Sequence, residues 1–303
     1  MELHQSLTRV GVGRLCKLFG KTRHAYYDML WHKQERWDDE QVIVELLHEL
    51  QREIPRLSSK KIHQILSPTL KAHGIQIGWN RLHALRGKHK LLCKRKKRYI
   101  STTDSNHRYR KYPNKVKELE VLQAEQLWVC DITYIRVAER FCFLSLVTDA
   151  YSHRIVGYCL YPTLEAEGSL IALRMAIGNL RHKPAGLIHH SDRGIQYCCD
   201  AYVEELQLYD IDISMTENGD PYQNAVAERL NGILKNTYDL KRTFASAAEA
   251  TEVVERSIYS YNHRRPHSSI EDLTPDSAHS VTGKLKRKWK AKKFEKVQTT
   301  PEP

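Results

Sequence analysis

Two aspartates and one glutamate stand where they could act together on a substrate. Asp131 lies in the middle of "LWVCDITYI", a mostly apolar run typical of a buried strand. Asp192 ends a second strand-like run, "GLIHHSD", and 35 residues separate it from Glu228 in "QNAVAERLNGILKN". A carboxylate in so apolar a strand is costly unless it is paired or binds a metal. Asp131 therefore needs a partner.

These three carboxylates have the chemistry of a divalent-metal site. Asp192 lies at the carboxyl end of its predicted strand, where open α/β sheets bind ligands. Glu228 lies on the polar face of an amphipathic helix that can pack beside the strands. Such a set suits Mg²⁺, and two such ions can hold the attacking and leaving oxygens of a phosphodiester in line. The alternative for Glu228 is a solvated helix face, as for most surface glutamates.

From about Leu127 the sequence predicts a mixed sheet with helices on its faces. Three consecutive strand-like runs, "LWVCDITYI", "FCFLSLVTDA" and "HRIVGYCLY", predict a meander. Helices and strands then alternate, and the helix containing Glu228 is expected from Pro221 to Tyr238, with Pro221 behind an Asp220 cap. "ASAAEATEVVERSIYSYNH" predicts the last helix. This order indicates an α/β core over residues 121–282.

The first 92 residues read as helices. "VGRLCKLFGKTRHAYYDMLW" has two apolar-periodic runs broken at Gly20, which predicts a small helix-turn-helix over residues 1–34. After the polar stretch Lys33 to Glu40, the runs "VIVELLHEL", "SSKKIHQIL" and "IGWNRLHALRGKHKLL" predict a second helix-turn-helix-like domain over residues 35–92. We expect both to bind DNA.

The charge balance favours a polyanionic partner. The chain has 48 Lys plus Arg against 36 Asp plus Glu, a formal charge of +12. Residues 93–120 predict a cationic linker with interleaved tyrosines. Near its start stand five consecutive basic residues, Lys94, Arg95, Lys96, Lys97 and Arg98. Contact with a phosphate backbone is favoured over flexible tethering alone. A disordered, solvated tail is expected for the basic residues 283–303, with nonspecific DNA binding as the alternative.

Other classes of protein are disfavoured. No window of 18 apolar residues exists, and the start "MELHQSLTRV" lacks a signal peptide's apolar stretch, so we expect a cytoplasmic protein with no membrane partner. The seven cysteines are scattered without a CxxC spacing, which argues against a disulfide framework and a cysteine zinc site.

Several motifs carry a resemblance to a known family. "WVCDITYI", "LVTDAYSHRIVGY", "HHSDRGIQY", "DPYQNAVAERLNGILK" and "YNHRRPHSSIEDLTP" resemble, in order, the integrase core of bacterial insertion-sequence transposases of insertion sequence family three. The match runs from about Trp128 to Ser277. Upstream, "PRLSSKKIHQIL" and "TTDSNH" are similar to the helix-turn-helix and linker of that family's second reading frame product.

The resemblance implies a fold, a reaction and a metal site. It implies a ribonuclease H-like core in which Asp131, Asp192 and Glu228 form a DDE triad that holds two Mg²⁺ ions, with Mn²⁺ as a substitute. The reaction would be DNA strand cleavage at the ends of an insertion element, followed by strand transfer. Cys130, before the first acid, and Asp220 depart from the family's common pattern without touching the triad.

The same resemblance implies partners. They are double-stranded DNA, as the element's terminal repeats and the target, and a homo-oligomer on that DNA, because synapsis joins two ends. The chain shows no heptad run, so an upstream frame product is a further expected partner. Expected DNA contacts are Asn224 and Lys235, on the helix face of Glu228, and Arg264 and Arg265 in "YNHRRPHSS". The alternative for Asn224 and Lys235 is that they are ordinary polar surface residues. The alternative for Arg264 and Arg265 is a structural turn held by salt bridges.

Two further residues and two further functions compete with this interpretation. Asp149 is a rival carboxylate, but its place at a strand end before "AYSHR" favours an Asx-type turn. His190 shares a strand face with Asp192, and a hydrogen-bonded structural role is favoured over contact with water or DNA. The competing functions are a non-catalytic DNA-binding regulator that competes for element ends and a structure-selective nuclease on the same fold.

Overall fold

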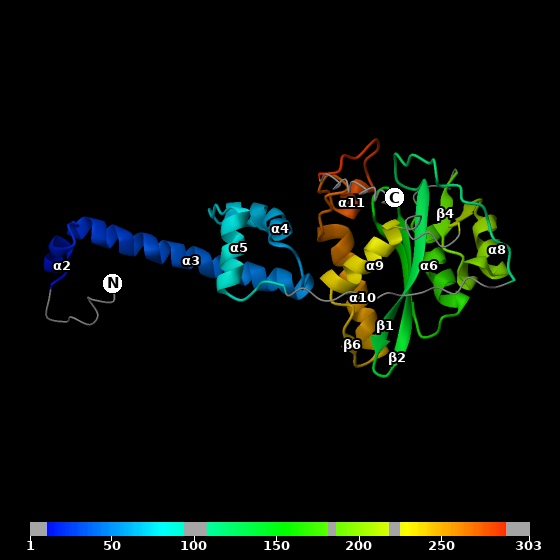
Figure 1. Cartoon of the computed structure of the whole chain (residues 1–303), viewed down its shortest axis with the longest axis horizontal. Helices are drawn as coiled ribbons and strands as arrows, with labels where there is room; N and C mark the ends of the chain where they lie inside the picture. Colours follow the sequence, from blue (N-terminus) through cyan, green and yellow to red (C-terminus); the bar gives the residue numbers. More distant parts are fainter. Residues whose placement is uncertain (1–10, 94–107, 181–185, 218–224, 289–303) are drawn as a thin grey trace, which may run out of the picture. The chain divides into compact units, whose positions relative to one another are not determined.

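Contacts divide the chain into two compact units. The computed structural model describes residues 11–93, 108–180, 186–217 and 225–288. The first unit is Met1–Arg52 with Leu66–Leu92, and the second is Glu53–Ile65 with Cys93–Pro303. In the described residues the first unit is helical and the second contains the sheet (Figure 1).

The helices of the N-terminal region are α2 (Val12–Leu18), α3 (Arg23–Glu53), α4 (Ser59–Ala72) and α5 (Trp79–Lys88). Gly20 lies between α2 and α3 with a φ of 62°, a left-handed conformation that glycine adopts without strain, and this confirms the predicted break. The boundary predicted between residues 34 and 35 instead falls inside α3. Lys33 to Glu40 carries no apolar stripe, but it contains neither glycine nor proline, so nothing in it stops a helix.

The sheet of the second unit has five main strands in the order β3-β2-β1-β4-β5, and a short β6 also pairs with β1. The first three strands form the predicted antiparallel meander, and β4 and β5 run parallel to β1. Their bounds are β1 (Leu127–Val137), β2 (Arg140–Asp149), β3 (Ile155–Tyr161), β4 (Ile188–Ser191), β5 (Asp212–Met215) and β6 (Thr243–Phe244). The predicted mixed α/β core is therefore confirmed.

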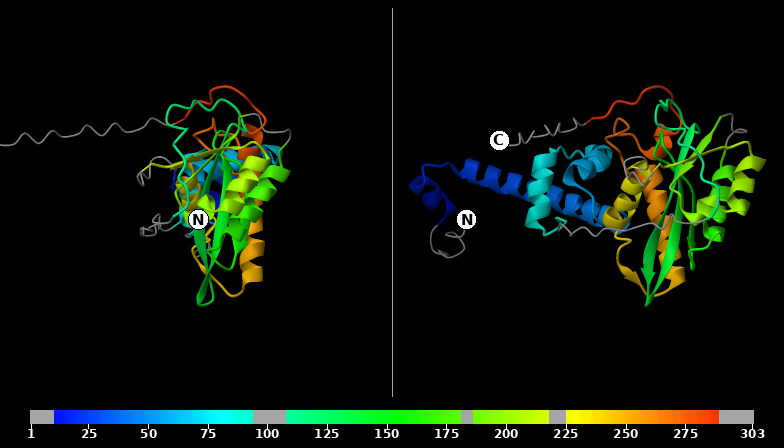
Figure 2. Two further views of the ribbon diagram at one scale, coloured as in Figure 1. Left: turned by 90° about the vertical axis from the view of Figure 1, so that its right-hand side faces the viewer. Right: turned by 45° about the vertical axis from the view of Figure 1, so that its right-hand side comes forward.

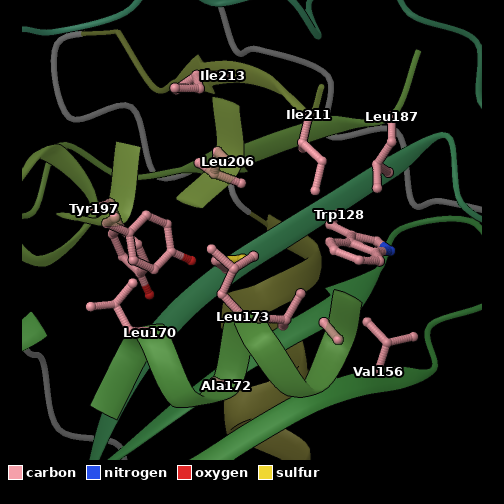
Figure 3. Close-up of a cluster of buried hydrophobic side chains, with 14 of the residues drawn as sticks. Trp128, Val156, Leu170, Ala172, Leu173, Leu187, Tyr197, Leu206, Ile211 and Ile213 are labelled. Carbon is pink, nitrogen blue, oxygen red and sulfur yellow. The ribbon is translucent and has the colours of Figure 1, made fainter. Parts of the chain in front are cut away.

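Helices lie on both faces of this sheet. Trp128 and Cys130 of β1 belong to the main core cluster, which also takes residues from α6 (Ala166–Gly178), α7 (Ile195–Cys198) and α8 (Asp200–Leu208) (Figure 3). Val129 points to the opposite face, because neighbouring strand residues alternate, and packs with Ala227 of α9 (Ala225–Thr237). The remaining helices are α10 (Ala247–Arg264) and α11 (Pro275–Ala278). Residues 218–224, where the start of α9 was predicted, lie outside the described ranges.

A glycine lets α6 approach the sheet closely. A Cβ placed on Gly157 of β3 would lie 2.0 Å from the Ala172 carbonyl oxygen and 2.9 Å from the Ala176 Cβ. Only a residue without a side chain fits between this strand and this helix.

Part of the predicted cationic linker packs on the sheet. The Lys115 backbone N–H donates to Ser214 of β5, and the Lys115 ammonium pairs with Asp212 at 2.6 Å. Tyr109 and Tyr112 are half-buried against the core cluster, so their rings are occupied there rather than offered to bases. Likewise, Gly283 and Lys284 of the predicted tail bond to Leu122 and Glu120, while residues 289–303 lie outside the described ranges.

A short segment from the helical region belongs to the sheet unit. The Arg56 N–H donates to the Thr237 carbonyl at the end of α9, and Lys61 donates to the Pro266 carbonyl at 2.7 Å. Glu53 forms an ion pair with Arg264. The loop between α3 and α4 and the first turns of α4 are thus held on the C-terminal part of the core.

Among the described residues, no helix combines the length and the apolar composition needed to cross a membrane.

Candidate active site

The two aspartates lie on neighbouring parallel strands. The register between β1 and β4 pairs Trp128 with His189 and Val129 with His190. If that register is continued by two residues, Asp131 stands opposite Asp192, which follows directly after β4. Both side chains then point to the same face of the sheet. The carboxylate of Asp192 is close enough to help raise the pKa of Asp131.

Asp131 lies on a stretch of β1 that has a strand neighbour on one side only. On the side away from β2, β4 pairs with Leu127–Val129, and β6 pairs with Arg136 and Val137. Between these pairings the edge of β1 faces α9, and the Ile132 N–H bonds to Asp131 Oδ1 at 2.9 Å instead of to another strand. The change of strand partner therefore creates an opening in the sheet where a carboxylate can lie.

Helix α9 brings the third carboxylate to this opening. Ala227, Leu230 and Leu234 are buried, which fixes the rotation of the helix against the sheet. Glu228 lies in the first turn and is exposed, so the sequence placed it correctly on a polar face. Its carboxylate has no hydrogen-bond or ion-pair partner among the described residues, yet it contributes to the raised pKa of Asp131.

The environment of Asp131 disfavours its negative charge. Burial, followed by the neighbouring carboxylate of Asp192, raises the pKa of Asp131 to about 7. A hydrogen bond from Asn231 Nδ2 to Asp131 Oδ2, 2.6 Å long, acts in the opposite direction. Asp192 Oδ1 accepts the Gly194 N–H at 2.9 Å, which closes a tight turn after β4. Asp131 thus has two other acids in its surroundings, and the hydrogen bonds that it accepts come from neutral donors.

The donor set fits hard cations. Carboxylate oxygens are the ligands that Mg²⁺ prefers, and a cation would relieve the mutual repulsion that raises the pKa of Asp131. Asn231 Oδ1 is buried beside Asp131 without a hydrogen-bond partner, as suits a group that would bond to a metal-bound water. Across the described ranges, no three His, Cys, Asp or Glu side chains already stand close enough to hold one ion.

Asn231 is the site residue that the sequence analysis missed. It shares the helix face of Glu228, three residues on, and this spacing was the available signal. The residue is only 8% exposed, because it turns inward to the open edge of β1.

The expected DNA contacts lie in different surroundings. The Lys235 ammonium lies 4.0 Å from the centre of the Tyr134 ring. It is also close enough to Asp131 for that carboxylate to affect the pKa of Lys235. Arg264 pairs with Glu53, and Arg265 is 8% exposed and bonds to His267, contacts that belong to a structural turn. Asn224 and the run Lys94 to Arg98 lie outside the described residues.

The two competing residues have structural contacts. Asp149 is fully buried, and its carboxylate accepts hydrogen bonds from the Ser152 N–H and hydroxyl and from the Glu125 N–H. This is the turn predicted for it. His190 is fully buried and bonds through Nδ1 to the Ser214 hydroxyl at 2.9 Å, which confirms a hydrogen-bonded structural role.

Comparison with known proteins supplies relatives for most of the chain. Two family models, both described as integrase core domain, match residues 122–221 and 209–275. A 31 kDa protein of the insertion element IS600 from Shigella sonnei is 33% identical over 267 residues, which are 86% of this chain and 96% of that protein.

Other relatives match over the core. The transposase of insertion sequence element IS629 from Shigella sonnei is 32% identical over 51% of each chain. The transposase InsF of insertion sequence IS3A from Escherichia coli is 32% identical over 50% of this chain and 52% of its own length. The chain thus spans about half the length of these two transposases.

Solved integrases are also similar. One is the HTLV-2 integrase catalytic core domain in complex with magnesium, 18% identical over 52% of this chain and 97% of that chain, with a TM-score of 0.41. Another is a chain of the simian T-cell lymphotropic virus intasome in complex with the PP2A regulatory subunit B56 gamma, 16% identical over 80% of this chain and 81% of that chain, with a TM-score of 0.46.

Proposed function

Because this chain belongs to the IS3 family of insertion-element transposases, with an integrase core of ribonuclease H-like fold, we propose that it cleaves DNA strands at the ends of its element and joins them to target DNA. A role in DNA transposition follows from the family. The proposal adds the reaction and the residues that perform it: Asp131, Asp192 and Glu228 as the catalytic carboxylates.

The closeness of Asp192 and Glu228 to Asp131 carries the proposal. They come from two parallel strands and one helix, and each of the other two raises the pKa of Asp131. A half-buried group of like charges is unfavourable for folding, so its presence is better explained by chemistry than by stability. Among the described residues, neither Asp131 nor Glu228 forms an ion pair with a basic side chain.

The carboxylates of Asp131, Asp192 and Glu228 would hold Mg²⁺, for which Mn²⁺ could substitute. Two bound ions would neutralise charge on the scissile phosphate and favour attack on phosphorus by water or by a DNA 3′ hydroxyl. In the first step, water adds to phosphorus and a 3′ oxygen leaves. In the second, that 3′ hydroxyl forms a bond to a target phosphorus while a target 3′ oxygen leaves.

The remaining proposed roles are binding and orientation. Lys94 to Arg98, Asn224, Lys235 and Arg264 would contact DNA phosphates; Arg265, being buried, would support the loop that presents Arg264. The DNA is double-stranded, as element ends and target. A homo-oligomer on DNA follows from the need to hold two ends together. An upstream frame product remains a proposed partner.

The test uses the purified full chain with labelled DNA that carries its own element's ends, in Mg²⁺. We expect cleaved and joined strands from the wild type and neither product from Asp131→Asn, Asp192→Asn or Glu228→Gln. Glu252→Gln, an exposed acid on α10, serves as the matched control and should stay active. DNA affinity should be nearly the same in all five proteins.

Two results would redirect the proposal. Full strand transfer by Glu228→Gln would show that the carboxylate set is wrongly assigned. Wild-type DNA binding without cleavage, also after addition of the upstream frame product, would instead favour a regulator that competes for element ends.

A further inference from the structure

The hairpin of β1 and β2 carries two neighbouring aromatic rings, and a cationic side chain lies at each end of this pair. Lys235 Nζ lies 4.0 Å from the centre of the Tyr134 ring, and the Tyr134 and Phe141 rings meet edge to face at 5.3 Å. The Arg136 guanidinium lies over the other end, 5.6 Å from the centre of the Phe141 ring. We call these four residues, Tyr134, Arg136, Phe141 and Lys235, the hairpin surface.

Strand register explains how the two rings meet. Arg136 pairs with Phe141, and Tyr134 pairs with Phe143, so Tyr134 is the diagonal neighbour of Phe141 across the two strands. The tip of this hairpin lies at the lower edge of the second unit in Figures 1 and 2. Beyond the helices that cover the rest of β1, Tyr134 is 45% exposed and Phe141 is 44% exposed.

The cations of this surface are not held in ion pairs with acids. Among the described residues, neither Arg136 nor Lys235 forms an ion pair, and the same holds for Arg140 and Lys241 nearby. Exposed aromatic rings on a soluble protein usually mark a binding surface when they cluster. Here the cations flanking them indicate an anionic partner rather than an apolar one.

Lys235 connects the hairpin surface with the carboxylate site. Tyr134 and Asp131 are three residues apart on β1 and so point to opposite faces of the strand, but Lys235, two turns beyond Glu228 on α9, contacts the Tyr134 ring. Burial lowers the pKa of Lys235, and Asp131 acts against that shift, so the same ammonium is also close to an acid of the site. A nucleic-acid strand bound at the acids could reach the rings along Lys235.

We propose that the hairpin surface binds unpaired nucleotides of the DNA strand next to the carboxylates, with bases stacked on Tyr134 and Phe141 and phosphates facing Arg136 and Lys235. Inside a duplex both faces of a base are covered by its neighbours, and only the outer face of the last pair is open, so two rings in a row can each stack on a base only where the strand is unpaired. The enzyme would thus hold an element end whose last base pairs are opened. This inference rests on the proposed function, since it takes the bound strand to be DNA.

Binding of defined DNA probes tests the stacking. The probes are a blunt duplex and the same duplex with a short single-stranded oligothymidine extension on either the 3′ or the 5′ strand, labelled at the far end and followed by fluorescence anisotropy without metal. The wild type should prefer one extended probe. Tyr134→Ala and Phe141→Ala should each weaken binding to that probe by roughly tenfold to a hundredfold, and binding to the blunt duplex should stay within about twofold.

Two controls separate stacking from loss of structure. Tyr134→Phe keeps the ring and should bind like the wild type. Tyr259→Ala removes a ring that is 63% exposed on α10, outside the hairpin surface, and should leave all probes unaffected. Thermal unfolding of each variant checks that the fold is intact.

Salt dependence separates the roles of the rings and the cations. Arg136→Gln should lower the salt slope of single-strand binding by about 0.7, the effect of one lost phosphate contact, while Phe141→Ala should leave the slope unchanged. A ring that acts only by supporting Arg136 would lower the slope as well, and that result would contradict stacking.

The failures are distinguishable. A wild-type chain that binds none of the probes contradicts the proposed function. Wild-type binding that Tyr134→Ala and Phe141→Ala leave unchanged, or weaken equally on blunt and extended DNA, overturns only this inference. A DNA-free change of oligomeric mass in Phe141→Ala, with probe preference retained, would assign the surface to contact between two copies instead.

Discussion

The Asn231 side chain donates a 2.6 Å hydrogen bond to the carboxylate of Asp131, joining the helix of one acid to the strand of another. Asn231→Leu keeps the size of the side chain and removes the donor. Because partners that orient metal ligands commonly contribute tenfold to a hundredfold in affinity or activity, we expect strand cleavage to need about that much more Mg²⁺. Cleavage rate against Mg²⁺ concentration measures it.

A matched variant on the same helix sharpens this test. Asn236→Ala removes an exposed amide that bonds to the Gly232 carbonyl and has no contact with an acid. It should show the wild-type Mg²⁺ requirement. An unchanged requirement in Asn231→Leu would mean that Asp131 is held by the strand alone.

Gly157 should tolerate no side chain. In Gly157→Ala the new Cβ would overlap the Ala172 carbonyl oxygen, so α6 must move away from β3. Forced rearrangement of a packed core costs about 1 to 3 kcal/mol or more, and we expect a lower midpoint of thermal unfolding or loss of soluble protein. Gly178→Ala, at the end of α6 with open space around it, should unfold at or above the wild-type temperature. Equal midpoints for the two variants would be inconsistent with this packing.

Asp149 should be needed for stability and not for chemistry. Its carboxylate accepts three hydrogen bonds that fix the turn after β2, and burial raises its pKa. Asp149→Asn replaces an acceptor oxygen with a donor, so we expect a loss of about 1 to 3 kcal/mol in the free energy of unfolding. Strand cleavage per folded molecule should remain. Loss of cleavage in a folded Asp149→Asn would make this residue a fourth catalytic acid.

Lys61 should make stability depend on pH above neutrality. Burial, with a contribution from Arg265, lowers the pKa of Lys61 to about 7 from an ordinary value near 10.5. Between these values the unfolded chain binds a proton that the folded chain lacks, so stability from this group rises as pH rises from about 7 to about 10. Below about pH 7 both states are protonated and the cost stays constant.

Lys61→Met removes this dependence while keeping the apolar stem. The difference in the free energy of unfolding between the variant and the wild type should therefore change with pH. As the pH rises through this window, it should shift in favour of the wild type by at most about 1.4 kcal/mol per pH unit. Lys60→Met, at an exposed neighbouring position, is the control. Unfolding midpoints that shift in parallel for all three proteins would contradict a lowered pKa in the folded state.

The positions of the three acids in the fold could be predicted because their signals are local. A charge within an apolar strand marks Asp131, and the end of a short buried strand marks Asp192. Helical periodicity alone places Glu228 on a polar face, and in the structure Glu228 is exposed. The meander and the alternation of helices and strands that follows were predicted for the same reason.

Contacts between distant residues could not be predicted from these signals. Asn231 and Asp131 are 100 residues apart, and periodicity does not distinguish a helix face toward solvent from one toward an open strand edge. Arg265 was predicted to contact DNA, because a loop of cations resembles a phosphate site, yet its side chain packs beside His267. The polar stretch Lys33 to Glu40 predicted a domain boundary, but it contains no helix-breaking residue, and α3 continues through it.

The membership of Glu53–Ile65 in the sheet unit has a consequence for how such a protein can be altered. The two units interleave along the chain, so no single cut separates them: a fragment that starts at residue 93 lacks Lys61 and leaves the Pro266 carbonyl without its donor. Fusing a foreign N-terminal region to this core at one junction would meet the same difficulty. An exchange between relatives that keeps both units whole needs a junction at each end of Glu53–Ile65 and a third before Cys93.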